Sequence, residues 1–203
     1  MIKKLYPSSF YNFLRFIQSN PVNKKILDCG AGGSDPKLAF FYENGFETYG
    51  IDISENQIKE AEDFCNKNNI KLNIIEGDMR SIPFESKFFG YVYSYLSMVH
   101  LSKNGTAQAI NEIYRVLVKS GLCYINFLSK DDRWFDEKEE TKPGEIISKH
   151  GNEEVVHSYY DDNEADDLFI NFEILYKEKR HISKGKYFDT ERTCVLEYIV
   201  KKL

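Results

Sequence analysis

A chain of 203 residues, 42% hydrophobic and 29% charged, is long enough to fold as one domain around a sizeable core. Its net charge of −5 argues against a nucleic-acid groove, because such grooves gain affinity by neutralising phosphates. No apolar stretch approaches the roughly 18 residues of a membrane span, and no signal peptide is visible in the first residues. We therefore expect a cytoplasmic protein.

The four cysteines, Cys29, Cys65, Cys123 and Cys194, lie far apart in the sequence. Their spacing fits neither a metal site nor a redox pair. We therefore expect reduced, mostly buried thiols and no metal centre.

The segment Ser8–Ser19 carries apolar residues at helical spacing. They are Phe10, Phe13, Leu14 and Ile17. This pattern predicts an amphipathic helix that forms an N-terminal cap over residues 1–22. Besides packing on the domain, the cap could close over a ligand as a lid, because it directly precedes a glycine-rich segment.

Three strand-like segments follow, at Lys25–Cys29, Glu47–Ile53 and Lys71–Glu76. Two helices separate them, the first beginning at Asp35-Pro36 and the second capped by Ser54. Strands that alternate with helices in this way predict a right-handed, doubly wound, parallel sheet.

Two further strands, Gly90–Ser94 and Leu122–Leu128, flank a predicted helix over Asn104–Lys119. Gly121 follows this helix as its expected stop.

The regular alternation then ends at an insertion over residues 129–157, in which Glu145–Ser148 and Glu153–His157 can pair as a hairpin. A long insertion at this point is more often functional than a broken core, so we expect it to act as a second lid. The last two strands, Phe172–Ile182 and Thr193–Lys201, are joined by a loop and should pair antiparallel.

A glycine-rich segment begins at the end of the first strand and reads Asp28-Cys29-Gly30-Ala31-Gly32-Gly33-Ser34. Its glycines allow a sharp turn and a close approach of the backbone to a ligand. The second and third strands also end in acids, Asp52 and Asp78. Because a carboxylate accepts hydrogen bonds from both hydroxyls of a ribose, the pattern predicts an adenosine-type ligand.

Asp28, at the entrance of the glycine segment, indicates which kind of adenosine-type ligand is expected. A dinucleotide-binding loop has the order Gly-x-Gly-x-x-Gly and offers helix amides to phosphates. An acid in this place repels a pyrophosphate, whereas it suits a ligand that carries an amino group and a sulfonium charge.

These motifs resemble those of the class I S-adenosylmethionine-dependent methyltransferases, from about Lys24 to Leu203. The glycine segment is similar to the first motif of that family, with Ser34 in place of the third glycine. Gly77-Asp78-Met79 resembles the motif after the third strand.

Two later segments add to the resemblance. Glu112–Leu117 is similar to the helix that leads to the fifth strand of the family. Phe88–Val92 matches the fourth-strand motif more loosely, because Gly90 stands where the family has an aspartate.

The resemblance implies a single methyltransferase domain over residues 1–203 with the Rossmann-like methyltransferase fold. This fold is α/β, with a doubly wound, mostly parallel seven-stranded sheet, helices on both faces and an antiparallel C-terminal hairpin. It also implies S-adenosyl-L-methionine as the cofactor and S-adenosyl-L-homocysteine as the product. In the family, the acids equivalent to Asp52 and Asp78 meet the ribose and the adenine. The cofactor-binding residues implied here are Asp28, Cys29, Gly30, Ala31, Gly32, Asp52, Ile53, Gly77, Asp78, Met79 and Tyr95.

The reaction implied is an in-line methyl transfer, in which proximity and alignment matter most because the leaving group is neutral. We predict a small-molecule acceptor, since the Asn/Asp-Pro-Pro-aromatic motif of base methylation is replaced here by Ser94-Tyr95-Leu96-Ser97. The candidates for a catalytic base are His100, His157 and Tyr160. The sequence identifies neither the acceptor nor the oligomeric state.

Two other functions fit the same motifs. One is a non-catalytic subunit that binds S-adenosylmethionine without turning it over. The other is an NAD-dependent oxidoreductase on a related sheet.

Overall fold

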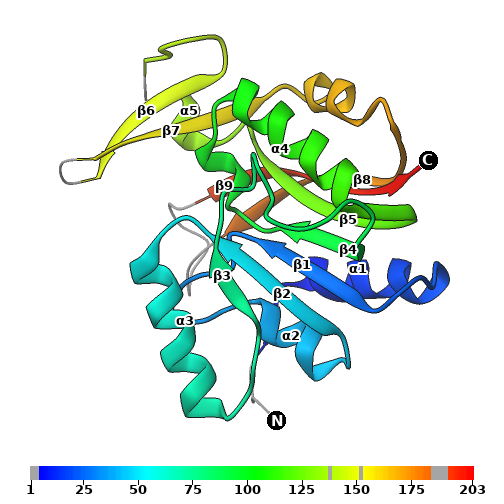
Figure 1. The fold of residues 1–203 in the computed structure, drawn as a ribbon. Helices are drawn as coiled ribbons and strands as arrows, with labels where there is room; N and C mark the ends of the chain where they lie inside the picture. The colour runs from blue at the N-terminus through cyan, green and yellow to red at the C-terminus, as the bar shows by residue number, and fades with distance from the viewer. Residues whose placement is uncertain (1–4, 137–138, 151–152, 184–191) are drawn as a thin grey trace.

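The computed structural model describes residues 5–136, 139–150, 153–183 and 192–203. A 9-stranded sheet carries helices on both faces, with α4 on one side and α1, α2 and α3 on the other (Figure 1). Within the described ranges, no helix is long and apolar enough to cross a membrane. The helical elements are α1 (Ser8–Ser19), α2 (Leu38–Glu43), α3 (Glu55–Asn68), α4 (Lys103–Val116), α5 (Arg133–Asp136) and the 3-10 turns η1 (Met98–His100) and η2 (Glu164–Phe169).

The parallel part of the sheet has the strand order β3-β2-β1-β4-β5. The strands are β1 (Lys25–Cys29), β2 (Glu47–Asp52), β3 (Ile74–Glu76), β4 (Phe89–Ser94) and β5 (Leu117–Ser129). The prediction of a doubly wound parallel sheet is confirmed. Because all these strands run the same way, the acids at the ends of β1 and β2 reach the same edge.

The antiparallel part of the sheet begins on β5. β9 (Arg192–Lys202) pairs with β5 from Leu122 to Leu128, and β8 (Phe172–Ser183) pairs with β9. The predicted antiparallel C-terminal hairpin is therefore confirmed.

The sheet has more strands than the seven expected, because β5 extends beyond its parallel neighbour. β4 pairs with β5 only as far as Ile125, and β7 (Glu153–Tyr160) pairs with it in parallel at Leu128 and Ser129. β7 forms an antiparallel hairpin with β6 (Glu145–His150), as predicted within the 129–157 insertion. The insertion thus adds two strands to the sheet.

Side chains alternate along the parallel strands and fill the two larger of the three hydrophobic clusters among the described residues. On β4, Tyr91 and Tyr93 belong to the core under α1 and α2, whereas Val92 belongs to the core under α4. Phe10 and Phe13 of α1 are fully buried in the first of these cores. The N-terminal helix is therefore a packed element of the domain, and its apolar face is not available to close over a ligand.

α4 ends earlier than predicted. A helix over Asn104–Lys119 was expected, but β5 begins at Leu117, and Gly121 lies within that strand. Lys202 of β9, which is buried, donates from Nζ to the backbone oxygens of Leu117 at 2.8 Å and of Tyr114 at 2.5 Å. A residue distant in sequence thus donates hydrogen bonds to carbonyl oxygens at the C-terminal end of the helix, which have no partner within the helix.

Gly90 stands where the methyltransferase motif has an aspartate, and its surroundings leave no room for a side chain. A Cβ atom on Gly90 would lie 2.0 Å from the backbone oxygen of Asn23 and 2.9 Å from Cγ2 of Val22. The segment that leads into β1 therefore crosses directly over this position of β4.

We expect Gly90→Ala to lower the free energy of unfolding by about 2 kcal/mol or more, since backbone must move to admit the methyl group. Urea denaturation measures this change. Gly105→Ala is the matched control, because the nearest atom to its Cβ is Oγ of Ser102 at 3.3 Å. The control should change the same quantity by less than about 1 kcal/mol, and equal losses in both variants would contradict the packing explanation.

Candidate functional site

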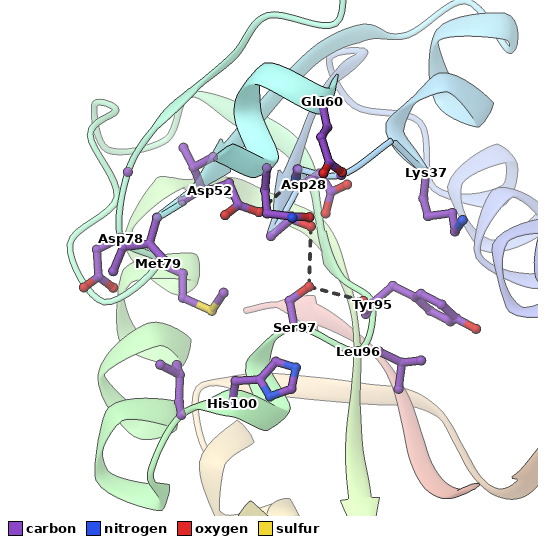
Figure 2. Close-up of a pocket in the computed structure, with 18 of the residues that line it drawn as sticks. Asp28, Lys37, Asp52, Glu60, Asp78, Met79, Tyr95, Leu96, Ser97 and His100 are labelled. Carbon is purple, nitrogen blue, oxygen red and sulfur yellow. Dashed lines mark hydrogen bonds between the residues drawn. The ribbon is translucent and has the colours of Figure 1, made fainter. Parts of the chain in front are cut away.

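A cavity of about 680 Å³ opens at the carboxyl ends of β1, β2 and β4 (Figure 2). The glycine segment, the start of α3 and the turns after β3 and β4 form its walls. Its lining residues are Asp28, Gly30, Gly32, Gly33, Ser34, Asp35, Lys37, Ile51, Asp52, Ile53, Gln57, Glu60, Gly77, Asp78, Met79, Arg80, Tyr95, Leu96, Ser97, His100 and Leu101.

The glycine segment is held in a tight turn against β2. Gly30 adopts φ +99°, a backbone conformation that glycine accepts at no steric cost, and its N–H donates to the backbone oxygen of Ile51 at 2.9 Å. A Cβ on Gly30 would lie 2.2 Å from Oγ of Ser97, and one on Gly32 would lie 2.5 Å from Cβ of Gln57. The close neighbours on both sides therefore require glycine at both positions.

Asp28 lies at the floor of the cavity with only 3% of its surface exposed. The hydroxyl of Tyr93 donates to its Oδ2 at 2.6 Å. Burial raises the pKa of the Asp28 carboxyl well above its usual value, and the nearby charge of Asp52 adds to this, while the Tyr93 hydrogen bond and Lys37 act in the opposite direction. A cation that entered the cavity would favour ionisation of this carboxyl.

Asp52 is fixed by two backbone amides at the end of β2. Its Oδ2 accepts from Gly32 N at 2.9 Å, and its Oδ1 accepts from Ser54 N at 3.0 Å. Ser54 in turn caps α3, as predicted, by accepting from Gln57 N. The carboxylate therefore joins the glycine segment to the start of α3.

Asp78 is paired with Arg80 within the turn after β3. Its carboxylate accepts from Arg80 Nε at 3.0 Å, from Nη2 at 2.6 Å and from the backbone N–H of Arg80 at 2.8 Å. These hydrogen bonds hold the pKa of Asp78 below its usual value. A role of Asp78 at an adenine remains a prediction.

The corner after β4 forms the opposite wall. Leu96 adopts φ +55°, and its N–H donates to Oδ1 of the buried Asn126 on β5 at 2.8 Å. Next to it, the hydroxyl of Ser97 has two possible acceptors, the backbone oxygens of Gly30 at 3.4 Å and of Tyr95 at 3.3 Å. Figure 2 shows Ser97 between the glycine segment and His100. The turn after β4 therefore packs directly against the glycine segment.

A second cavity of about 460 Å³ adjoins the first and shares Leu96 and His100 with it. The rings of His100 and His157 lie edge to face there, with their centroids 4.9 Å apart. The insertion thus supplies part of a wall next to the first cavity. The lining residues are Leu96, Val99, His100, Leu128, Asp132, Trp134, Ser148, Lys149, His157, Tyr159 and Thr193.

The structure gathers most of the residues predicted from the sequence. All predicted cofactor-binding residues line the first cavity except Cys29 and Ala31. Both are buried, and Cys29 belongs to the core under α4, where burial raises the pKa of its thiol well above the usual value.

The three candidates for a base lie in different surroundings. His100 lines both cavities, and His157 lines the second. Tyr160 is buried, packs against Phe127 with ring centroids 4.9 Å apart, and is not among the lining residues of either cavity. Of the described part of α1, no residue lines either cavity, so the expected N-terminal lid is not observed.

Gln57 and Glu60 of α3 were not predicted as site residues, although both line the first cavity. The sequence pattern that could have identified them lies within the same helix. The predicted cap at Ser54 starts the helix beside the glycine segment, and residues three apart on a helix share one face. Helical spacing from Ser54 could therefore have identified both.

The family described as "Methyltransferase domain" matches residues 27–125 of the chain. A sterol 24-C-methyltransferase of Debaryomyces hansenii is 30% identical over 122 residues, which is 58% of this chain and 31% of that protein. A phosphoethanolamine N-methyltransferase of Plasmodium falciparum is 28% identical over 120 residues, with 58% and 45% covered. The chain therefore spans less than half of the length of these two relatives.

Solved structures share the fold over nearly the whole chain. An S-adenosylmethionine-dependent methyltransferase of Methanosarcina mazei has a TM-score of 0.80 at 18% identity and covers 98% of this chain and 99% of its own. An S-adenosylmethionine-dependent methyltransferase of Clostridium acetobutylicum has a TM-score of 0.72 at 15% identity, with 96% and 90% covered. Residues 27–125 therefore match the methyltransferase-domain family, and the whole chain has the fold of S-adenosylmethionine-dependent methyltransferases.

Proposed function

We propose that the first cavity binds S-adenosylmethionine and that the protein transfers its methyl group to a small molecule seated in the second cavity. The observation that carries this proposal is that the two cavities are neighbours, because Leu96 and His100 line both of them. A donor site next to a separate acceptor site is what methyl transfer needs, because the two reactants must meet in line.

The charges of the first cavity fit a cationic ligand. Five acids line it, namely Asp28, Asp35, Asp52, Glu60 and Asp78, and its two basic side chains are already paired, Lys37 with Asp35 at 2.7 Å and Arg80 with Asp78 at 2.6 Å. The excess of acids attracts a sulfonium and an amino group and repels a pyrophosphate. This balance favours S-adenosylmethionine over NAD.

Six of the predicted residues then have a proposed role. Asp28 faces the amino group of the ligand, Asp52 accepts from the ribose hydroxyls, and Asp78 and Met79 lie beside the adenine. Gly30 and Gly32 let the backbone approach the ligand. S-adenosylmethionine, when bound, supplies a methyl group on a positively charged sulfur.

The second cavity also favours an enzyme over a non-catalytic binding subunit. A cytoplasmic location and the absence of a nucleic-acid partner remain parts of the proposal. They are supported by the four free cysteines and by the net charge of −5.

Calorimetry tests the donor. We expect S-adenosylhomocysteine to bind the protein with micromolar affinity and NAD to give no heat of binding. Binding of NAD together with no binding of S-adenosylhomocysteine would show that the first cavity serves an oxidoreductase.

Asp52→Asn tests the proposed ribose contact. Losing hydrogen bonds to a charged group costs about 1.5–3 kcal/mol, so the Kd for S-adenosylhomocysteine should rise roughly 10- to 150-fold. Asp63→Asn makes the same change on the exposed surface of α3 and should leave the Kd unaltered. An unchanged Kd in Asp52→Asn means that the ribose lies elsewhere.

The raised pKa of Asp28 makes binding depend on pH. In the free protein the carboxyl binds a proton up to a higher pH than an ordinary aspartate, and an amino cation beside it favours the ionised form. Affinity for S-adenosylhomocysteine should therefore increase as pH rises through the raised pKa of Asp28, with release of a proton.

Calorimetry in buffers of different ionisation enthalpy measures this proton. Asp28→Asn keeps an acceptor for the Tyr93 hydroxyl but cannot ionise, so both the proton release and the pH dependence should disappear in this variant. Proton release that persists in Asp28→Asn would assign it to another group.

A further inference from the structure

The second cavity combines aromatic walls with polar groups. Rings of His100, Trp134, His157 and Tyr159 line it, and Leu96, Val99 and Leu128 add apolar surface. Tyr159 is held in place by Phe135, whose ring centroid lies 5.1 Å away. Aromatic side chains in such number favour a flat aromatic ligand, which can pack edge to face or offset against them.

The acid of this cavity is not available to hold an amine. Asp132 is 1% exposed, its Oδ1 accepts from Trp134 N at 2.9 Å, and its Oδ2 accepts from Cys194 N at 2.7 Å. Both oxygens thus serve the backbone of the cavity wall, and the carboxylate is buried, whereas that of Asp52 in the first cavity is partly exposed. Among the described lining residues Asp132 is the one carboxylate, so an ammonium group would find no exposed ionic partner.

The cation of this cavity is also a poor anchor for a phosphate. The side chain of Lys149 is 78% exposed, and its Nζ lies 3.8 Å from Oε1 of Glu154, which is 63% exposed. An ion pair in water of this kind contributes little to binding. The ligand is therefore selected by its shape and by hydrogen bonds to neutral or titrating groups.

The two imidazoles lie where the cavities meet. His100 on η1 lines both cavities, and His157 on β7 packs against its ring. Besides these two, Asp132 and Lys149 are the charged or titrating lining residues, together with Tyr159. An imidazole at this junction can take a proton from a hydroxyl that points toward the methyl donor.

We propose that the second cavity is the acceptor site and that its acceptor is a small phenol, whose hydroxyl meets His100. This rests on the proposed function of the first cavity. The hydroxyl proton passes to His100 and the oxygen forms a bond to the methyl carbon. The carbon–sulfur bond breaks with its electron pair on sulfur, which gives an aryl methyl ether and S-adenosylhomocysteine. His100 then releases its proton to water.

Trp134 is the only tryptophan of the chain and lines this cavity, so its fluorescence reports occupancy. With S-adenosylhomocysteine bound, we expect 4-nitrophenol to quench it saturably and 4-nitrobenzylamine to bind at least 10-fold more weakly. Trp134→Phe should abolish the signal and retain S-adenosylhomocysteine binding, and free tryptophan corrects for absorption by the probe.

The two proposals fail in different ways in this experiment. No binding of S-adenosylhomocysteine in the calorimeter rejects the proposed function itself. Binding of S-adenosylhomocysteine with no saturable quenching by 4-nitrophenol, or with equal affinity for the amine, rejects the phenol site alone.

His100→Gln tests the proton transfer. 4-Nitrophenol is largely ionised at pH 8 and needs no base, whereas 4-methylphenol keeps its proton. A general base contributes about 100-fold or more, so the variant should lose methyl transfer to 4-methylphenol by that factor and to 4-nitrophenol by less than about 5-fold. Transfer of labelled methyl from S-adenosylmethionine measures both rates.

His181→Gln is the matched control, since it makes the same change on β8 at a residue that lines neither cavity. It should leave both rates as in the parent protein. Equal losses with the two phenols in His100→Gln would reduce His100 to a structural role, and methyl transfer to 4-nitrobenzylamine in preference to both phenols would overturn the acceptor class.

Discussion

β5 is longer than its parallel neighbour β4, and this difference in length positions the insertion next to the site. Beyond Ile125 the backbone groups of β5 still need hydrogen-bond partners on both edges. β9 supplies them on one edge, and β7 supplies them on the other at Leu128 and Ser129. Because β7 belongs to the insertion, this pairing brings His157 to the carboxyl ends of the parallel strands.

The same extension of β5 holds the chain that leaves β4. Leu96 turns through φ +55°, a left-handed conformation that costs a branched residue roughly 1–2 kcal/mol. Its N–H donates to the buried Asn126 of β5, and a hydrogen bond of this kind contributes about 1 kcal/mol. The cost of the left-handed conformation and the contribution of the hydrogen bond are similar in size. This hydrogen bond therefore offsets much of the strain in the turn that separates the two cavities.

Features that depend on neighbouring residues could be predicted from the sequence. Predictions failed where a residue far away in the chain determines the local structure. Strand β1 and the cap at Ser54 follow from patterns within a few residues, and both are confirmed. The end of α4 depends on Lys202, far away in the chain. Tyr160 was predicted as a candidate base together with His157, and the strand was predicted only as far as residue 157. Since the strand continues, alternation turns Tyr160 into the core and leaves His157 at the cavity.

The two cavities differ in charge in a way that suits their proposed ligands. The acids of the first cavity attract the positive sulfur of a methyl donor, and that charge disappears when the methyl group leaves. In this proposal the lining carboxylates then surround a neutral thioether, so the same carboxylates that attract the donor hold the product less strongly. In the second cavity the oxygens of Asp132 are bound by backbone amides, and the ligand is oriented by aromatic rings. In this proposal charge selects the donor, shape selects the acceptor, and loss of charge in the reaction favours release of the product.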